Sequence, residues 1–498
     1  MRSTTTRRTA VWLGCTLLLG AAACGREPRT QEARAAASDA PVAPPSVGTY
    51  PSGSDQVEGW IAAQDSDAIR AHAWDVWTSI TSPTSVPNQP VWETWYSGYE
   101  VYQMDSASLA RGRRHLHDFE TPRQLGHAHR VGAGLARAIP QFPAEAVTSF
   151  NRYSTPLAQF IWTKRYNDAN VLNGINARFD QEHTPVAQRL ILSSADSVAP
   201  GELALKPVFQ FVSGTQVTAL PYWGGDNSAA SSDSLNPTPG SWKQGVAVDP
   251  TGRLRPGSKV WMSVNGNPPD SLTVVPLSAF YHFTLTAADS AAYSQFAASS
   301  GDDVGAGNQG ATDSVLKMVR PGNLALLMAM HVTTKEIPNW TWQTFWWSPG
   351  TTRFSRGRPA RLPEPWSHYD MNAAYYMVTP PGAAGGTPHV VYNPYLETNL
   401  FGYIPGPGTD STKWTGIESN CMSCHRMAAW KVLACDTCFP ETPDYRPNGQ
   451  INPADSTLFA GYTKLDFLWS ITRAQLRPQY RAAARAPAAT APPGTNAR

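Results

Sequence analysis

Residues 323–347 read NLALLMAMHVTTKEIPNWTWQTFWW, and they give the clearest structural signal in a chain of 498 residues. The first part, residues 323–334, is apolar or β-branched, which is typical of a β-strand. Residues 335–339 contain Pro338 and predict a turn. Aromatic and polar side chains alternate in residues 340–347, so this part predicts a second strand. Together they predict an antiparallel hairpin.

The flanking sequence mixes helices and strands. Residues 66–80 place apolar side chains at helical spacing, and residues 143–180 do so in two pieces divided at Pro156. Further strands are predicted at residues 203–212, 259–264 and 271–285. We therefore expect an α+β fold, with a Trp-rich mixed body of antiparallel strands over residues 57–410.

Composition narrows the possible functions. The chain holds 40 Lys and Arg residues against 38 Asp and Glu residues, a formal charge of +2. Such a balance lacks the concentrated basic face that nucleic acid requires, so we expect no nucleic-acid partner. The 43 Pro and 38 Gly residues favour short strands and long loops, and the 18 Trp residues indicate an aromatic core or binding face.

The first residues are interpreted as an export signal. Residues 1–23 combine an arginine-rich start with a short apolar stretch, as in a signal peptide. The small residues that precede Cys24 resemble a bacterial lipoprotein cleavage box, which implies that Cys24 is lipidated. An ordinary signal peptide, with Cys24 incidental, is the alternative. Residues 24–56 are predicted to be a flexible tether and residues 478–498 a disordered tail.

The motif with the most chemical information is Cys421-Met422-Ser423-Cys424-His425. This C-x-x-C-H spacing is that of a c-type haem attachment site. Two thiols one helical turn apart can both add to the vinyl groups of one haem, and the next histidine can bind the iron. A zinc site built with Cys435 and Cys438, or a thioredoxin-like dithiol, are the alternatives.

The motif resembles the attachment site of the cytochrome c superfamily, and in particular exported single-haem proteins with a large N-terminal body. That resemblance implies a small helical haem c-binding region over residues 411–477, with helices after the motif and at 455–475. It implies one covalent haem held by Cys421 and Cys424, with His425 as the proximal iron ligand. The expected location is the bacterial cell envelope, anchored to a membrane by lipid only and facing the periplasm.

The residues that follow the C-x-x-C-H motif offer no second axial ligand for the iron. Small cytochromes c use a methionine further along the chain, but here Met427 is the last methionine and lies too close to reach the opposite haem face. His331, at the end of the first hairpin strand, is our candidate distal ligand, and a core histidine bonded to backbone is the alternative. Other candidates are Met328, Met330, His368, Met371, Met377 and His389.

Two other groups of residues are open to interpretation. Cys435 and Cys438 form a second C-x-x-C without a following histidine, and in an oxidising compartment we expect them to close a local disulfide. The histidines at 115, 117, 127 and 129 are interpreted as surface or core polar residues rather than metal ligands.

Three functions remain open from the sequence. The first is one-electron transfer by an envelope c-type cytochrome, with redox proteins as partners. The second is a haem enzyme or a gas- or peroxide-reactive protein with an open sixth iron position. The third is a binding lipoprotein in which the haem is accessory.

Overall fold

The computed structural model describes most of the chain beyond the N-terminal segment. The described residues are 40–104, 117–120, 147–191, 201–224, 242–299, 315–397, 401–404, 413–417, 419–431 and 448–476. Cys24, Cys435, Cys438 and the predicted tail lie outside them. Among the described residues, no helix is both long and apolar enough to cross a membrane.

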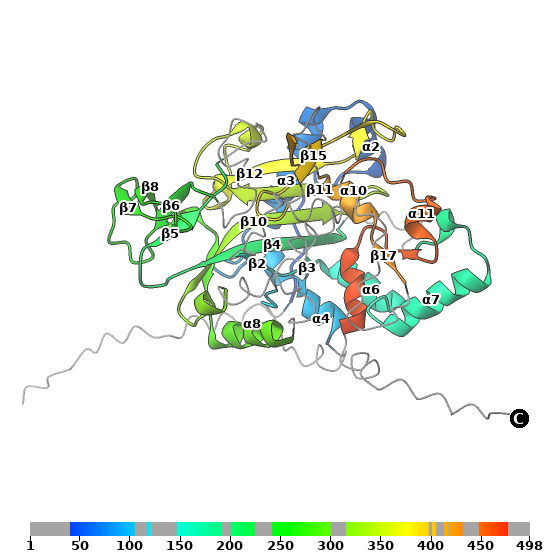
Figure 1. The fold of residues 1–498 in the computed structure, drawn as a ribbon, viewed down its shortest axis with the longest axis horizontal. Coiled ribbons are helices and arrows are strands. Elements are labelled where there is room, and N and C mark those ends of the chain that lie inside the picture. Colours follow the sequence, from blue (N-terminus) through cyan, green and yellow to red (C-terminus); the bar gives the residue numbers. More distant parts are fainter. Residues whose placement is uncertain are drawn as a thin grey trace, which may run out of the picture. The chain divides into compact units, whose positions relative to one another are not determined.

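An antiparallel sheet forms the centre of the α+β body (Figure 1). Its strand order is β1-β3-β4-β10-β11-β12, while β2 also pairs with β4 and β9 with β10. The strands are β1 (Tyr96–Ser97), β2 (Val147–Ser149), β3 (Arg152–Tyr153), β4 (Leu203–Val212), β9 (His282–Thr284), β10 (Leu324–Thr334), β11 (Thr341–Trp347) and β12 (Tyr369–Ala374).

The predicted hairpin lies inside this sheet. Strands β10 and β11 pair antiparallel, with Thr334 opposite Thr341 next to the turn and Ala329 opposite Trp346 at the far end. Every residue of β10 is buried except His331, and every residue of β11 is buried. The hairpin prediction is therefore confirmed.

Helix α3 (Ser66–Ile80) covers one face of the sheet. The Asp65 side chain caps its first turn by accepting the Ala68 amide at 3.0 Å. Its Trp77 ring stacks on Phe345 of β11 with the centroids 4.2 Å apart. Fully burying one aromatic side chain of this kind contributes roughly 1.5–3 kcal/mol. The apolar periodicity of residues 66–80 therefore predicts both the helix and its buried side.

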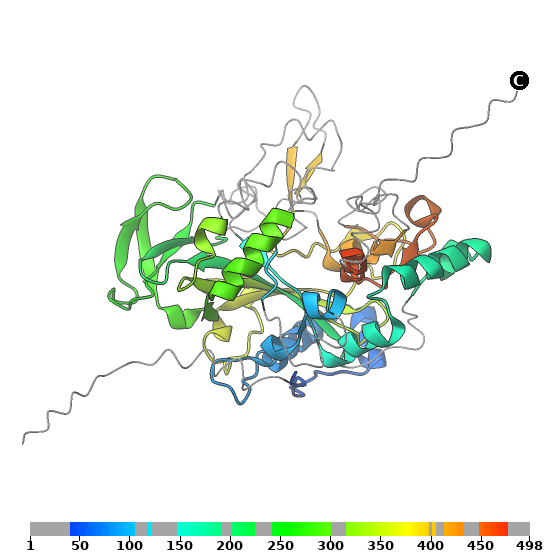
Figure 2. The same cartoon turned by 90° about the horizontal axis from the view of Figure 1, so that it is seen from below.

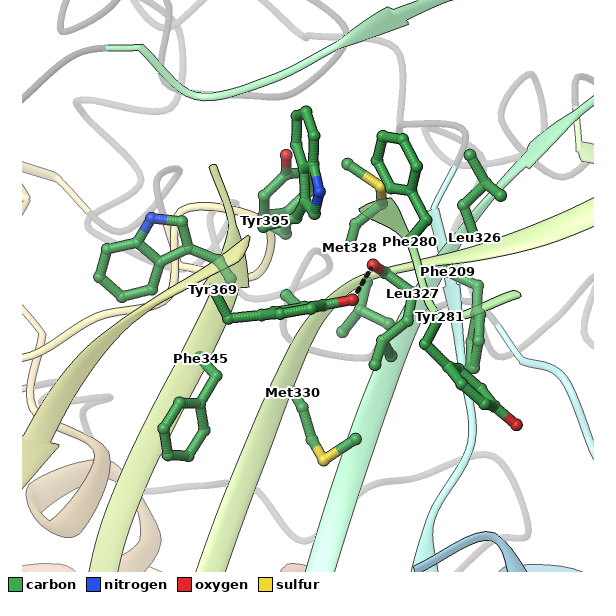
Figure 3. Close-up of a cluster of buried hydrophobic side chains, with 14 of the residues drawn as sticks. Phe209, Phe280, Tyr281, Leu326, Leu327, Met328, Met330, Phe345, Tyr369 and Tyr395 are labelled. Carbon is green, nitrogen blue, oxygen red and sulfur yellow. Dashed lines mark hydrogen bonds between the residues drawn. The ribbon is translucent and has the colours of Figure 1, made fainter. Parts of the chain in front are cut away.

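Figure 3 shows the core in which the central strands meet. The Tyr369 hydroxyl donates a hydrogen bond of 2.8 Å to the carbonyl oxygen of Leu327. Met328 and Met330 both lie among aromatic and aliphatic side chains of this cluster and are fully buried. They are core residues, as expected for polarisable side chains that fill irregular gaps.

A smaller sheet packs its own apolar side chains beside the central one. Its order is β5-β6-β8-β7, and all its pairs are antiparallel except β6 with β8. The strands are β5 (Thr218–Pro221), β6 (Gly245–Val248), β7 (Lys259–Met262) and β8 (Asp270–Val275), and helix α8 (Ala287–Ser299) follows in the chain. Figure 2 shows this small sheet at the opposite end of the body from the motif-bearing helix α10 (Cys421–Arg426).

The C-terminal segment packs against helices from the first half of the chain. Those helices are α4 (Gly98–Tyr102), α6 (Thr155–Lys164) and α7 (Ala169–Gln181), and α2 (Ser54–Ala62) precedes α3. One buried cluster contains Leu157 and Leu172 together with Met422, Trp430 and Phe459. Figures 1 and 2 both show α10 and α11 (Ser456–Phe459) close to these helices. The motif thus belongs to a core shared with the body.

Several local predictions are wrong. In the described part of the predicted helical stretch 143–180, which begins at residue 147, the chain does not form two helices divided at Pro156. Instead, β2 and β3 come first, and Pro156 lies in the first turn of α6. Pro is favoured there because its missing amide has no helical partner to lose. The predicted strand 271–285 is two strands, β8 and β9.

The predicted helices around the motif also differ. After α10 the chain turns at Met427 and forms β17 (Ala429–Trp430), which pairs with β18 (Thr463–Lys464). No continuous helix covers 455–475, because α11, β18 and the 3-10 helix η9 (Trp469–Leu476) divide it. Gly461 between α11 and β18 has a φ of +76°, which ends the helical run.

The remaining short elements connect these layers. They are the 3-10 helices η1 (Val91–Thr94), η3 (Val186–Gln188), η6 (Leu277–Ala279), η7 (Arg353–Ser355) and η8 (Trp366–His368), and the paired strands β13 (Val378–Thr379) with β14 (Thr387–Pro388) and β15 (Phe401–Ile404) with β16 (Lys413–Ile417).

Within the segment that the sequence predicts to be a tether, part of the chain contacts the body. The Thr49 and Ser52 amides donate to the carboxylates of Asp75 and Glu336, each at 2.7 Å. The indole of Trp95 donates to the carbonyl of Val42 at 2.9 Å. Residues 24–39 lie outside the described residues.

Candidate haem site

Helix α10 presents the C-x-x-C-H motif. The Asn420 side chain caps it by accepting the amide of Ser423 at 3.0 Å. The same side chain donates to the carbonyls of His389 at 2.6 Å and Tyr376 at 3.1 Å. The start of the helix is therefore attached to the chain that follows β12, and the two thiols lie one helical turn apart.

Neither of the two motif cysteines forms a disulfide within the described residues. Cys421 is buried, with its sulfur 4.0 Å from the carbonyl of Val391, whereas Cys424 is partly exposed. Burial raises the pKa of the Cys421 thiol well above its usual range, and the charge of the nearby Glu397 carboxylate adds to this effect. The Cys421 thiol is thus protonated near neutral pH.

His425 is held in one tautomer. Its Nδ1 lies 2.8 Å from the carbonyl oxygen of Phe467, which can only accept a hydrogen bond. The proton is therefore on Nδ1, and Nε2 keeps its lone pair. Burial lowers the pKa of His425 to about 3, so the ring is neutral at physiological pH. A neutral imidazole whose other nitrogen is bonded to a carbonyl is the usual form of a metal-binding histidine.

The surroundings of His425 come from the hairpin. The ring of Trp342 on β11 lies 4.2 Å from the His425 ring, tilted by 39°. The next residue, Arg426, donates to the side chain of Asn339 in the hairpin turn at 3.1 Å. The indole of Trp469 donates to the carbonyl of Cys424 at 3.2 Å. Helix α10 is therefore fixed against the end of the β10–β11 hairpin.

Trp342 also identifies the sheet face that His425 covers. Side chains two residues apart in a strand share a face, and so do directly opposed residues on neighbouring strands. Trp342 therefore shares its face with Thr344, and one cross-strand row runs through Lys206, His331, Thr344 and Asn372. All of this row except Thr344 is only partly buried, in a sheet that is otherwise mostly buried.

The predicted distal residue, His331, belongs to this row. Its positive charge and that of Lys206 would both lower the pKa of His425, after burial, so the two histidines lie close enough to interact. The His331 Nε2 is buried without a hydrogen-bond partner, although it lies 3.2 Å from Glu397 Oε1. Nε2 of His331 has no hydrogen bond to a described backbone group.

Glu397 was not identifiable from the sequence. Its backbone amide and its carboxylate both bond to Asn393, the amide donating to the Asn393 carbonyl at 2.8 Å and Oε2 accepting the Asn393 amide at 2.6 Å. The Asn393 side chain in turn donates to Thr344 Oγ1 at 2.7 Å. The carboxylate that faces His331 is therefore fixed to the same cross-strand row. Glu397 lies in a loop, where no periodic pattern marks its position.

The other candidate distal ligands are engaged elsewhere. Met371 lies in the large core cluster, and the Met377 sulfur accepts the amide of Ile451 at 3.5 Å. His389 stacks against Tyr376 with centroids 4.5 Å apart. His368 lies 3.5 Å from Glu364, in an ion pair that is partly exposed. None of them is a charge neighbour of His425, in contrast to His331.

Of the histidines at 115, 117, 127 and 129, only His117 lies in the described part of the chain. His117 Nδ1 lies 3.0 Å from Asp289, and its ring stacks on Phe283 with the centroids 4.1 Å apart. It is a partly buried polar residue, while residues 115, 127 and 129 lie outside the described part. In the described ranges no group of three or more His, Cys, Asp and Glu side chains is arranged to hold a metal ion.

The residues of the motif fit a haem with axial imidazole ligation. They supply two cysteines without a disulfide, a neutral imidazole whose Nδ1 bonds to a carbonyl, and the His331 imidazole on β10, whose Nε2 lies 3.2 Å from Glu397. No protein-family model, curated protein or solved structure matches the chain. The chemistry of the site therefore rests on the residues themselves.

Proposed function

We propose that the protein is a c-type cytochrome that carries one covalently bound haem for one-electron transfer in the cell envelope. The observation that carries the proposal is the bond from His425 Nδ1 to the Phe467 carbonyl, at the residue directly after two cysteines at the correct spacing. A structural zinc site or a dithiol pair does not require the next residue to be a neutral imidazole with Nε2 left for a metal.

Each residue has a defined part in this proposal. Cys421 and Cys424 form the thioether bonds, and His425 binds the iron from the proximal side. His331, on the sheet face that His425 covers, would be a second imidazole able to bind the iron. The haem, when bound, supplies a single-electron redox change. The protein supplies an apolar, largely buried environment that determines the reduction potential.

The proposal includes the location and the partners. Export by the signal peptide over residues 1–23 brings the thiols to the compartment in which haem attachment takes place. Lipidation of Cys24 tethers the body to the membrane. Electron donors and acceptors are then redox proteins of the envelope, and nucleic acid has no part.

One observation favours a second function. The His331 imidazole and the Glu397 carboxylate, 3.2 Å apart, have the composition of an acid–base pair. If His331 does not bind the iron, this pair can move protons at a ligand such as peroxide in the open sixth position. The protein would then be a haem enzyme.

Two measurements on the exported protein test these proposals. Mass spectrometry of the intact chain is expected to show one added haem, and substitution of both Cys421 and Cys424 by Ala is expected to remove it. A chain without covalent haem would overturn both functions. An optical spectrum of a six-coordinate, low-spin iron supports electron transfer, whereas a high-spin ferric spectrum with fast peroxide reaction supports the enzyme. In that case Glu397→Gln should slow the peroxide reaction without removing the haem.

A further inference from the structure

The carbonyl that bonds to His425 belongs to a strained turn. The amide of Leu468 donates to the carbonyl of Leu465 at 2.9 Å, which closes a four-residue turn. The two central residues, Asp466 and Phe467, have φ angles of +45° and +70°. Two positive φ values in succession define a type I′ turn, in which Asn, Asp and Gly are favoured and Phe is not. The turn therefore needs support from outside itself.

A buried ion pair supplies that support. The Lys335 ammonium lies 2.6 Å from Asp466 Oδ2, and the two side chains are only 1% and 3% exposed. Lys335 also donates to the carbonyl of Pro338 at 2.9 Å, and the Trp340 indole reaches Asp466 Oδ2 at 3.4 Å. Lys335, Pro338 and Trp340 all lie in the connection between β10 and β11. The β10–β11 turn therefore contacts and stabilises the Asp466–Phe467 turn, which carries the carbonyl bonded to His425.

The Phe467 side of the turn is held as well. The Phe467 carbonyl also accepts the amide of Trp469 at 3.2 Å, and the Leu465 amide donates to the carbonyl of Ala428 at 2.8 Å. The guanidinium of Arg426 lies 4.9 Å from the centre of the Phe467 ring. The direction of the carbonyl is therefore determined by contacts on both sides, and its bond to His425 has little freedom to change.

We propose that Lys335 and Asp466 are positioning residues for the proximal histidine. By holding the Asp466–Phe467 turn, they aim the Phe467 carbonyl at His425 Nδ1 and so set the basicity of the imidazole that faces the iron. This inference rests on the proposed function. A firm bond from Nδ1–H to a carbonyl makes the imidazole a stronger donor and favours ferric iron, which lowers the reduction potential.

The test compares two buried ion pairs. Lys335→Met with Asp466→Asn removes both charges of the positioning pair, and Asn still tolerates positive φ. The control, Arg473→Met with Glu120→Gln, removes a second buried pair, whose side chains are 7% and 9% exposed and for which no contact with the turn is described. We expect haem attachment in both variants, an upward shift of the midpoint potential only in the first, and no shift in the control. Faster solvent exchange of the His425 Nδ1 proton, by tenfold or more in nitrogen-15 NMR, should accompany the shift.

The possible results distinguish a failure of the positioning role from a failure of the proposed function. An unchanged potential and unchanged exchange, with stability lowered as much as in the control, would show that the pair is only structural and overturn the inference. If the native chain carries no covalent haem, the proposed function fails, yet the exchange of the Nδ1 proton still tests the positioning role. Should the first variant not fold, Lys335→Gln with Asp466→Asn keeps a neutral donor and acceptor and gives the same comparison.

Discussion

His425 Nδ1 lies 2.8 Å from the carbonyl oxygen of Phe467, a residue 42 positions further along the chain. The contact joins the motif helix to a turn that the sequence alone does not mark. It also fixes which nitrogen of the imidazole remains available, so a five-residue motif acquires a defined chemical orientation.

Replacing His331 by Ala should change the iron's spin state. If this imidazole is the second axial ligand, its removal leaves the sixth coordination position of the iron either empty or occupied by water. The low-spin ferric spectrum then becomes largely high-spin. His368→Ala, which alters a partly exposed histidine, is the matched control and should leave the spectrum unchanged. An unaltered low-spin spectrum in His331→Ala would remove His331 as the ligand.

Removing one charge of the buried Lys335–Asp466 pair should lower the free energy of unfolding strongly. Lys335→Met leaves the Asp466 carboxylate buried without its partner, which typically destabilises a protein by about 3–5 kcal/mol. Urea denaturation should show a lower midpoint. The added substitution Asp466→Asn should recover most of the loss, because no uncompensated charge then remains. Arg356→Met breaks an exposed ion pair with Asp67 and should have little effect.

Removing the N-cap of α10 should lower the stability of the protein, by less than the loss of the Lys335 charge does. Asn420→Ala removes the acceptor for the Ser423 amide and the donor to two carbonyls. Loss of an N-cap of this kind costs about 0.5–2 kcal/mol. We expect lower stability and a reduced yield of haem-loaded protein. Asn420→Asp keeps the cap and should restore the stability in part, which thermal denaturation can measure.

Asp118 should make stability depend on pH. Burial raises its pKa to about 7, its Oδ1 is buried without a hydrogen-bond partner, and its Oδ2 accepts the Tyr99 amide at 2.8 Å. Between pH 4 and 7 the folded state keeps a proton that the unfolded state has lost, so stability should fall as pH rises across this range and level off above it. The expected loss is on the order of 4 kcal/mol, since the pKa rises from 3.8 to about 7 and one pKa unit corresponds to about 1.4 kcal/mol.

Asp118→Asn should flatten that dependence, because a neutral amide resembles the protonated acid. Urea denaturation of both proteins at several pH values between 4.5 and 8 gives the comparison. Asp67→Asn, at an exposed position, serves as the control and should keep the slope of the native protein. Equal slopes in Asp118→Asn and the native chain would mean that other groups cause the pH dependence.

The fold was predictable where one kind of pattern dominated. The hairpin around Lys335 and helix α3 follow from local periodicity, since long-range contacts agree with it. Residues 455–475 were not predictable, because their apolar side chains fit a helix while Gly461, Asp466 and Phe467 adopt positive φ. There tertiary contacts, including the buried partner of Asp466, override the local preference.

Some residues of the candidate site were predictable from the sequence, and others were not. The cysteines, His425 and the choice of His331 come from the motif and from the absence of later ligands. Glu397 and the Phe467 carbonyl could not be anticipated, because loops bring them to the site and a backbone carbonyl has no sequence signature. The packing of both against the hairpin is visible only once the strands are paired.

The burial of the Cys421 sulfur has a consequence for biogenesis. A thiol enclosed between Val391 and the core of helix α10 is out of reach of an attachment enzyme once the body has closed around it. If the proposed haem is attached at Cys421, its thioether bond would therefore have to form before the chain around Val391 has packed over the sulfur. The rate of folding and the supply of haem would then compete in each new chain.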